Sequence, residues 1–312
     1  MMSSTKTSAM SHKPKRKTQS PFDYVRWYAG DWIIIFLMLV LCFITLYPIW
    51  YTLILSFNDS QDAMMGGIYW LPRKFTLESY RTVFIDRAIL KAFNVTIWRT
   101  GIGTLSSVFF TSMVAYAFSK KNLMGRKFYL ILGTITMFFG GGLIPYFILL
   151  RSIGLYDTFL VYIIPALFNF YNLIIFMSFF REIPPALEES AKIEGANDFL
   201  IFIKLILPVS APVLATIALF NGVYHWNDYF AGVMYISNPD LQPIQTFLYR
   251  IIASVSMTKS IVGMPVGASA QQVSSQSVKL ATMVTTTAPI ICIYPFLQRY
   301  FVKGIMIGSI KG

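Results

Sequence analysis

Charged residues are scarce in this chain, and acidic residues are the scarcest. Asp and Glu together number 14 and Lys and Arg 26 among 312 residues, so charged side chains make up 13% of the chain. Ordinary globular proteins carry about a quarter. Hydrophobic residues make up 55%, and the mean hydropathy is +0.59. A soluble chain of this length has too little interior to bury so much apolar surface. The composition therefore excludes soluble enzymes, nucleic-acid-binding domains and disulfide scaffolds.

Residues that bind metals or carry out catalysis are equally few. The two histidines are His12 and His225, and the two cysteines, Cys42 and Cys292, fall within long apolar runs. No His pair has the spacing of zinc ligands, and two buried thiols form no disulfide framework. The chain also lacks the Gly-x-x-x-x-Gly-Lys-Ser/Thr loop that cradles nucleotide phosphates and the Gly-x-Ser-x-Gly turn of serine hydrolases. We therefore expect no catalysis, no metal and no cofactor in this chain itself.

What the chain has in abundance is long uncharged sequence. Six apolar runs of 19 to 25 residues contain no Asp, Glu, Lys or Arg, and a seventh uncharged stretch, at 260–277, is too rich in Ser and Gln to span a membrane. A helix needs about 20 apolar residues to cross the hydrocarbon core of a membrane. We predict an all-α membrane protein with a basic tail at 1–30, a transmembrane domain at 31–312 and a connecting loop at 181–206. The six predicted transmembrane helices lie at about 33–57, 95–119, 128–150, 158–180, 205–229 and 280–300.

The basic residues are unevenly distributed around these runs. If both termini face the cytoplasm, 16 of the 26 Lys and Arg residues lie in inside segments, at about twice the density of the outside segments. This is the positive-inside bias of membrane proteins, and it explains the net charge of +12 without a nucleic-acid partner. We expect a multi-pass protein with both termini in the cytoplasm. The cluster Lys13–Lys17 is either an orientation signal that binds anionic membrane lipid or part of a solvated tail.

Helix-breaking residues fall within several predicted spans. Backbone groups freed by such breaks are satisfied by neighbouring helices or by a water-filled cavity, which favours a transport path. Gly and Pro are also common in transmembrane helices that simply pack closely, so this alternative stays open. The residues concerned are Gly140-Gly141-Gly142, Pro145, Pro165, Pro208, Pro212, Pro289 and Pro295.

The inside loop between the fourth and fifth predicted spans contains clear helix signals. Pro184-Pro185 suits the first turn of a helix, and Glu188-Glu189 then lies near the positive N-terminal end. Gly195 stands where a left-handed residue ends a helix, and Asn197 or Asp198 can cap a second helix. We predict a helix, a sharp turn and a second helix that re-enters the membrane. On these signals alone the loop is an interfacial helical hairpin.

The same loop resembles the signature loop of ABC-importer permease subunits. In that family Glu-Ala-Ala is followed by Gly four positions later and then by an aliphatic residue and a Leu-Pro pair. Here the order is Glu189-Ser190-Ala191, Gly195, Leu205 and Leu207-Pro208, with Ser190 in place of the middle alanine. Because Gly and Pro each make up only about 5–7% of ordinary sequences, a chance match at these spacings is rare.

Two further segments are similar to permeases of carbohydrate importers. Residues 75–80 and 93–96 look like the approach to the second span, and residues 298–312 are similar to the C-terminus of maltose-type permeases. On this resemblance, which covers residues 31–312, the chain is identified as a member of the maltose-type or aldouronate-type family of ABC-importer permeases. The resemblance implies the type I importer permease fold with a cytoplasmic coupling helix, located in the bacterial plasma membrane.

The resemblance also implies function and partners. Such a subunit forms the transmembrane pathway for a carbohydrate, here interpreted as an oligosaccharide, as a heterodimer with a second, homologous permease. Two ABC ATPase subunits bind ATP and Mg²⁺, an extracellular solute-binding protein delivers the substrate, and a helix of the loop transmits the motion of the ATPases. The residues implied in ATPase coupling are Glu188, Glu189, Ser190, Ala191, Gly195, Leu207 and Pro208.

Polar and aromatic residues gather near the outer end of the fifth predicted span. Tyr224, Trp226, Asn227 and Asp228 combine aromatic rings with amide and carboxylate groups, as sugar-binding sites do, and ionisable groups within a membrane are candidates for function. The alternative is that the aromatic rings anchor the helix at the lipid–water boundary. The polar loop 261–277 is a second candidate, as a segment that reaches into the solute-binding protein.

Three other functions remain open on the sequence alone. The signature loop is shared by importers of non-sugar solutes, which is the first alternative. An ion-coupled secondary carrier is the second, although such carriers use acids or histidines at mid-membrane and the six runs contain no acid and one histidine, His225. A structural membrane protein is a third, and it would not depend on an ATPase.

Overall fold

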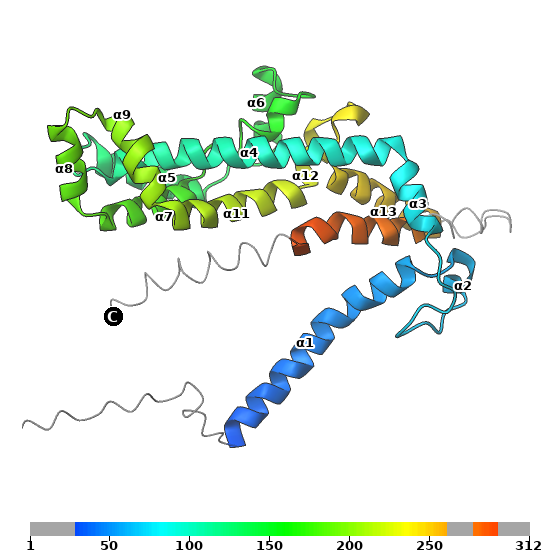
Figure 1. Cartoon of the computed structure of the whole chain (residues 1–312). Coiled ribbons are helices and arrows are strands. Elements are labelled where there is room, and N and C mark those ends of the chain that lie inside the picture. Colours follow the sequence, from blue (N-terminus) through cyan, green and yellow to red (C-terminus); the bar gives the residue numbers. More distant parts are fainter. Residues whose placement is uncertain (1–28, 261–276, 293–312) are drawn as a thin grey trace, which may run out of the picture. The chain divides into compact units, whose positions relative to one another are not determined.

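The computed structural model describes residues 29–260 and 277–292, and within them it consists of helices, turns and loops, with one isolated β-bridge between Asn58 and Phe75 (Figure 1). The chain divides into two compact units after Trp50. The described part of the first unit belongs to α1, Ala29–Ser56, whose 28 residues give a length of about 42 Å. That is enough to cross a membrane.

The second unit is built along α4, Arg87–Ser119. The carboxylate of Asp86 caps the start of α4 by accepting a hydrogen bond from the N–H of Ala88 at 2.8 Å. Helices α7, Phe170–Glu182, and α11, Ala211–Asn227, pack along it (Figure 1). The α4–α11 contact is close, because a Cβ atom at Gly103 would lie 2.5 Å from Nε2 of His225. Small residues permit such close helix contacts in membrane proteins.

Two predicted spans are bent where the sequence places breakers. Helices α5, Arg126–Phe138, and α6, Leu143–Ser152, meet at 116° across residues 139–142, and Gly142 has φ +85°. The segments Asp198–Val209 and Ala211–Asn227 meet at 84°. The first of these segments comprises α9, Asp198–Ile201, a π-helical turn at Phe202–Ile206, and α10, Leu207–Val209. The expected interruptions at Gly140-Gly141-Gly142 and at the opening of the fifth span are therefore confirmed.

The predicted fourth span, 158–180, differs from the structure in its first half. A 3-10 turn occupies Phe159–Tyr162, non-helical backbone follows, and α7 begins only at Phe170. Pro165 lacks the N–H that a continuous helix needs. The side chain of Asn169 then caps α7 by accepting a hydrogen bond from the N–H of Asn172 at 3.0 Å.

The described helices do not by themselves add up to six spans. By length and composition, Gly30–Ser56 and Arg87–Ser119 can cross a membrane, and the number rises to four if each bent pair is one span. The helix Ser277–Cys292 is apolar but shorter, and the predicted last span continues to residue 300, outside the described residues. The tail 1–28, most of the loop 261–277 and the C-terminal segment from residue 293 also lie outside them. Six spans remains a prediction.

Short elements complete the end of the unit at α3, Glu78–Ile85. The segment before α3 contains α2, Ser60–Met64, and is held by Asp62, which accepts hydrogen bonds from Asn58 Nδ2 at 3.0 Å and Arg73 Nε at 2.9 Å. The hydrogen bond from Asn58, and after it the one from Arg73, hold the pKa of Asp62 below its usual value. Its carboxylate is therefore charged at neutral pH. The remaining elements are α12, Phe230–Tyr235, the 3-10 turn Pro239–Leu241, and α13, Ile244–Ser260.

Candidate functional site

The predicted helix–turn–helix of the loop is present as α8, Pro185–Ile193, followed by α9. Pro184 is the N-cap of α8 and Pro185 its first residue. After the helix, Gly195 has φ +84°, and its N–H donates to the carbonyl of Lys192 at 3.0 Å. This left-handed residue reverses the chain, so the predicted role of Gly195 as the turn residue is confirmed.

Of the two residues predicted to cap the second helix, Asn197 does so. Its Oδ1 accepts a hydrogen bond from the N–H of Leu200 at 2.8 Å. Asp198 instead forms an ion pair with Lys192 of α8, at 3.0 Å between Nζ and Oδ1. The Asn197 cap and the Lys192–Asp198 pair thus fix the turn between α8 and α9, and both helices lie at the end of α4 opposite to α3 (Figure 1).

One side of α8 is attached to α4. Lys120, at the end of α4, forms an ion pair with Glu188 and lies 4.1 Å above the ring centroid of Tyr116. Tyr116 is buried and stacks on Phe202 with ring centroids 5.5 Å apart. Ala191 packs against the same hydrophobic cluster. These contacts join α8 to the core of the unit.

The other side of α8 faces outward. Glu189 and Ser190 are exposed, and the Ser190 hydroxyl donates to the carbonyl of Ala186 at 2.9 Å. Ile193, four residues after Glu189, is 87% exposed, a large value for an isoleucine at the end of a helix. Sequence reasoning missed Ile193, although the i, i+4 spacing from Glu189 places it on the same side of the helix. This side presents an acid, a hydroxyl and an apolar side chain together.

The remaining residues predicted for ATPase coupling lie farther from the outer side of α8. Leu207 is partly buried and packs against the hydrophobic cluster, while Pro208 is exposed in α10. Both stand just before the 84° bend. Pro208 fits here because proline is tolerated in the first turn of a helix and disfavoured within a longer one.

A second polar site is buried in the unit, where Arg99 of α4 meets Asp228 at the end of α11. Arg99 has a side chain that is 1% exposed, forms an ion pair with the Asp228 carboxylate and donates from Nη1 to the Asp228 carbonyl at 2.8 Å. Its guanidinium carbon lies 4.3 Å from the ring centroid of Tyr162. Oδ1 of Asp228 also accepts hydrogen bonds from the N–H groups of Phe230 and Ala231, which caps α12.

A cavity of about 280 Å³ lies beside this ion pair, and we call it the tyrosine cavity. Tyrosine rings and the ion pair form much of its wall, so it offers aromatic faces, hydroxyl groups and charge together. Its lining residues are Arg99, Tyr146, Leu150, Val161, Tyr162, Pro165, Ala166, Tyr224, Asp228, Phe230, Ala231 and Tyr235.

The structure brings together two of the four residues predicted for the substrate pathway. Tyr224 and Asp228 line the tyrosine cavity. Trp226 does not: it is 9% exposed, and its Nε1 donates to the carbonyl of Thr286 in the helix Ser277–Cys292 at 3.0 Å. Asn227 is exposed and donates to the carbonyl of Val223. Trp226 is therefore a packing residue, neither an interfacial anchor nor a cavity wall.

Sequence reasoning missed Arg99, because the charge-free run begins one residue later, at Thr100. The available signal was a basic residue inside the predicted span 95–119, since charges within spans are rare and are usually paired. Among the described residues, no group of three or more His, Cys, Asp and Glu side chains is arranged to hold a metal ion.

Comparisons with known proteins cover nearly the whole chain. Residues 29–307 match the family described as binding-protein-dependent transport system inner membrane component. The chain is 38% identical over 283 residues to the polygalacturonan/rhamnogalacturonan transport system permease protein YtcP of Bacillus subtilis (strain 168), covering 90% of this chain and 98% of that protein.

Two solved structures share the fold. One is a bacterial ABC transporter involved in the import of the acidic polysaccharide alginate, with 28% identity and a TM-score of 0.79 over 88% of this chain and 99% of the matched chain. The other is a bacterial alginate ABC transporter in complex with an alginate pentasaccharide-bound periplasmic protein. That match has 16% identity and a TM-score of 0.50 over 86% and 93% of the two chains.

Proposed function

Because this chain belongs to the family of binding-protein-dependent transport system inner membrane components, we propose that it helps to form the transmembrane pathway of an ATP-driven importer for an oligosaccharide. The chain is a transport subunit with an ABC-importer permease fold, and it is not an enzyme. The observation that carries the proposal is α8, which is attached to α4 on one side and presents Glu189, Ser190 and Ile193 on the other.

The energy for transport comes from partners in this proposal. Two ABC ATPase subunits hold ATP and Mg²⁺ and contact the outer side of α8, so the end of the unit that carries α8 faces the cytoplasm, as do both termini. A second, homologous permease completes the pathway as a heterodimer. An extracellular solute-binding protein delivers the substrate, in keeping with the family description.

The carbohydrate substrate is supported by the relatives and by the tyrosine cavity. YtcP is named for the transport of polygalacturonan and rhamnogalacturonan, and the matched structure is an alginate importer. Tyrosine rings stack on sugar rings while hydroxyl and charged groups bind sugar hydroxyls. Ligand pockets for small molecules measure about 300–1,000 Å³. At about 280 Å³ the tyrosine cavity suits one sugar unit of a longer chain.

Reversing the charge of Glu189 tests the contact with the ATPase. We expect Glu189→Lys to reduce the amount of ATPase that co-purifies with the full-length chain at least tenfold, because it changes the exposed side of α8 and leaves the Lys120–Glu188 pair intact. Glu78→Lys is the matched control, since Glu78 is an exposed acid on α3 at the opposite end of α4. Equal recovery of ATPase with both variants, at equal membrane levels, would contradict the proposed coupling surface.

Removing the ring of Tyr224 tests the tyrosine cavity. We expect Tyr224→Ala to raise the KM for oligosaccharide uptake about tenfold, because a sugar ring in the cavity would lose the aromatic face on which it stacks. Asn227→Ala is the control, since Asn227 lies three residues away and does not line the cavity. Uptake is measured with a labelled oligosaccharide at several concentrations, and an unchanged KM for Tyr224→Ala would remove Tyr224 from the pathway.

Two of the three alternatives from the sequence, the non-sugar importer and the ion-coupled carrier, are separated by the same uptake assay. An importer of a non-sugar solute would show no competition by any oligosaccharide. An ion-coupled carrier would take up solute without the ATPase, and it would need an acid that can bind the ion. Asp228, the acid beside the tyrosine cavity, is engaged by Arg99 and by the cap of α12.

A further inference from the structure

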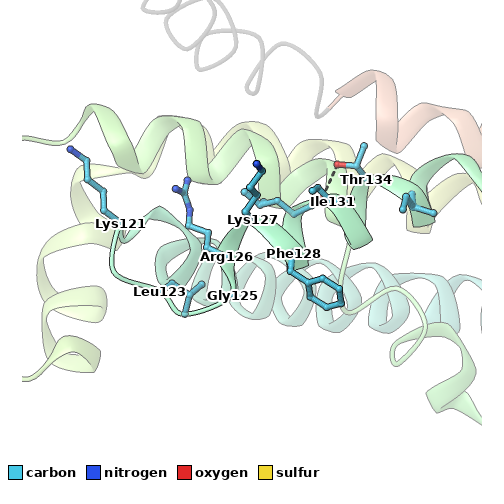
Figure 2. Close-up of a pocket in the computed structure, with 10 residues that line it drawn as sticks. Lys121, Leu123, Gly125, Arg126, Lys127, Phe128, Ile131 and Thr134 are labelled. Atoms are coloured by element: carbon cyan, nitrogen blue, oxygen red, sulfur yellow. Dashed lines mark hydrogen bonds between the residues drawn. The ribbon is translucent and has the colours of Figure 1, made fainter.

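A wide groove of about 1,070 Å³ runs along the start of α5, and the function proposed above does not use it. We call it the α5 groove. It is formed by the turn that follows α4 and by the first ten residues of α5 (Figure 2). Figure 2 shows the cationic ends of Lys121, Arg126 and Lys127 pointing to one side, with Ile131 and Thr134 farther along the helix and Phe128 turned the other way.

Two of the three cations at this groove carry uncompensated charge. Arg126 is engaged, because its Nε donates to the carbonyl of Phe118 at 2.8 Å. Lys121 and Lys127 are exposed and make no ion pair or hydrogen bond within the part of the chain that the structure describes. None of the described residues that line the groove is acidic. The positive charge at its mouth is therefore available to an anion.

In a second groove, by contrast, the charge of the lysine is neutralised by an acidic residue. This groove, of about 440 Å³, also contains a lysine, Lys91 of α4. There, however, Nζ of Lys91 lies 2.7 Å from Oδ1 of Asp240, which lines the same groove. Of these two grooves, only the α5 groove combines an open apolar wall with unpaired cations.

The apolar wall of the groove lies next to the cations along α5. Ile131 and Ile135 lie four and eight residues after Lys127, so the three side chains share one side of α5. Both isoleucines are about half exposed, at 52% and 48%. The hydroxyl of Thr134 donates to the carbonyl of Leu130 at 2.8 Å, so this polar group is satisfied within the helix. From Lys127 to Ile135 the helix rises about 12 Å, which is the length of a large part of an acyl chain.

We propose that the α5 groove binds one anionic phospholipid, with its phosphate at Lys121 and Lys127 and an acyl chain along Ile131 and Ile135. The charge selects an anionic headgroup, and the isoleucines select an attached hydrocarbon chain. A free acidic sugar would satisfy the lysines but not the apolar wall. The predicted span that begins at residue 128 places the lysines at the membrane surface, where basic side chains attract anionic lipid. The orientation of the chain in the membrane, given under the proposed function, determines only which leaflet of the bilayer supplies this lipid.

Binding of lipid to the purified full-length chain in a non-ionic detergent tests this site. The probes are dioleoyl phosphatidylglycerol, dioleoyl phosphatidylcholine and glycerol 3-phosphate, and bound lipid is counted by native mass spectrometry. We expect phosphatidylglycerol to bind more tightly than phosphatidylcholine. Each lysine near an anionic surface contributes about fivefold to affinity, so Lys121→Gln/Lys127→Gln is expected to weaken phosphatidylglycerol binding about 25-fold.

The control variant is Lys74→Gln/Lys91→Gln, which removes the same charge at the opposite end of the unit and is expected to bind phosphatidylglycerol as the unaltered chain does. A further variant, Ile131→Ser/Ile135→Ser, is expected to weaken lipid binding while both lysines remain. Equal binding of the two lipids, equal loss in the control, or displacement of lipid by glycerol 3-phosphate would each overturn the proposal. If a double variant does not fold, the single variants Lys121→Gln and Ile135→Ser replace it. The assay needs no transport, so its failure is distinct from failure of the proposed function.

Discussion

Replacing Gly195 with proline is expected to reduce ATP-driven uptake at least 100-fold while the chain still inserts in the membrane. Gly195 has φ +84°, whereas proline is confined to about −65°. Proline also removes the N–H that donates to the carbonyl of Lys192. Because a Cβ atom at this position would meet nothing within 4 Å, the effect comes from the backbone conformation and not from crowding.

The measurement compares uptake with ATP hydrolysis in vesicles that contain the complete transporter. In Gly195→Pro the reversal after α8 is lost, so α8 no longer keeps its position relative to α9, and we expect hydrolysis to continue without uptake. Gly195→Asn is the matched control, because asparagine tolerates the left-handed conformation better than other residues. Uptake by Gly195→Pro at the rate of the unaltered chain would disprove the coupling role of α8.

Removing the charge of Arg99 alone is expected to cost about 3–5 kcal/mol of stability, because it leaves the carboxylate of Asp228 buried without its partner. In Arg99→Met a long side chain without charge fills the position, which is 1% exposed. The side chain of Asp228, which is 12% exposed, then lacks its cationic partner. We therefore expect Arg99→Met to unfold at a markedly lower temperature than the unaltered chain when both are purified in the same detergent.

The double variant Arg99→Met/Asp228→Asn distinguishes an ion pair from simple loss of packing. Asparagine keeps Oδ1 as the acceptor for the N–H groups of Phe230 and Ala231, so the cap of α12 survives. With both charges removed, we expect most of the lost stability to return, because replacing a whole buried ion pair is often nearly neutral. If the double variant is as unstable as Arg99→Met, the contribution of Arg99 is packing alone.

The turn at Gly195 could be predicted from the sequence because its causes are local. The prolines at the start of α8, the glycine after it and the capping asparagine at 197 act through backbone angles and hydrogen bonds within a few residues. The same locality explains why the break at Gly140-Gly141-Gly142 was expected and is present. No knowledge of distant contacts was needed for either feature.

The buried polar site could not be assembled in this way. Arg99 and Asp228 are 129 positions apart in the chain, and only the packing of α4 against α11 brings them together. Trp226 looked like a partner of Tyr224 because the two are close in sequence. On a helix, however, residues two apart do not face each other. The non-helical first half of the predicted fourth span could not be predicted from apolar composition either, because that composition indicates preference for a membrane and not backbone conformation.

Arg99 stands on the uninterrupted helix α4 and Lys120 is the residue that caps its C-terminal end, about 32 Å farther along the helix axis. One of them is bonded beside the tyrosine cavity and the other to α8. A rod of that length needs to tilt by only 5° for its far end to swing by about 3 Å, roughly the diameter of a water molecule. In the proposed importer, a tilt of α4 is therefore the motion that would carry a displacement of α8 to the ion pair at the wall of the tyrosine cavity.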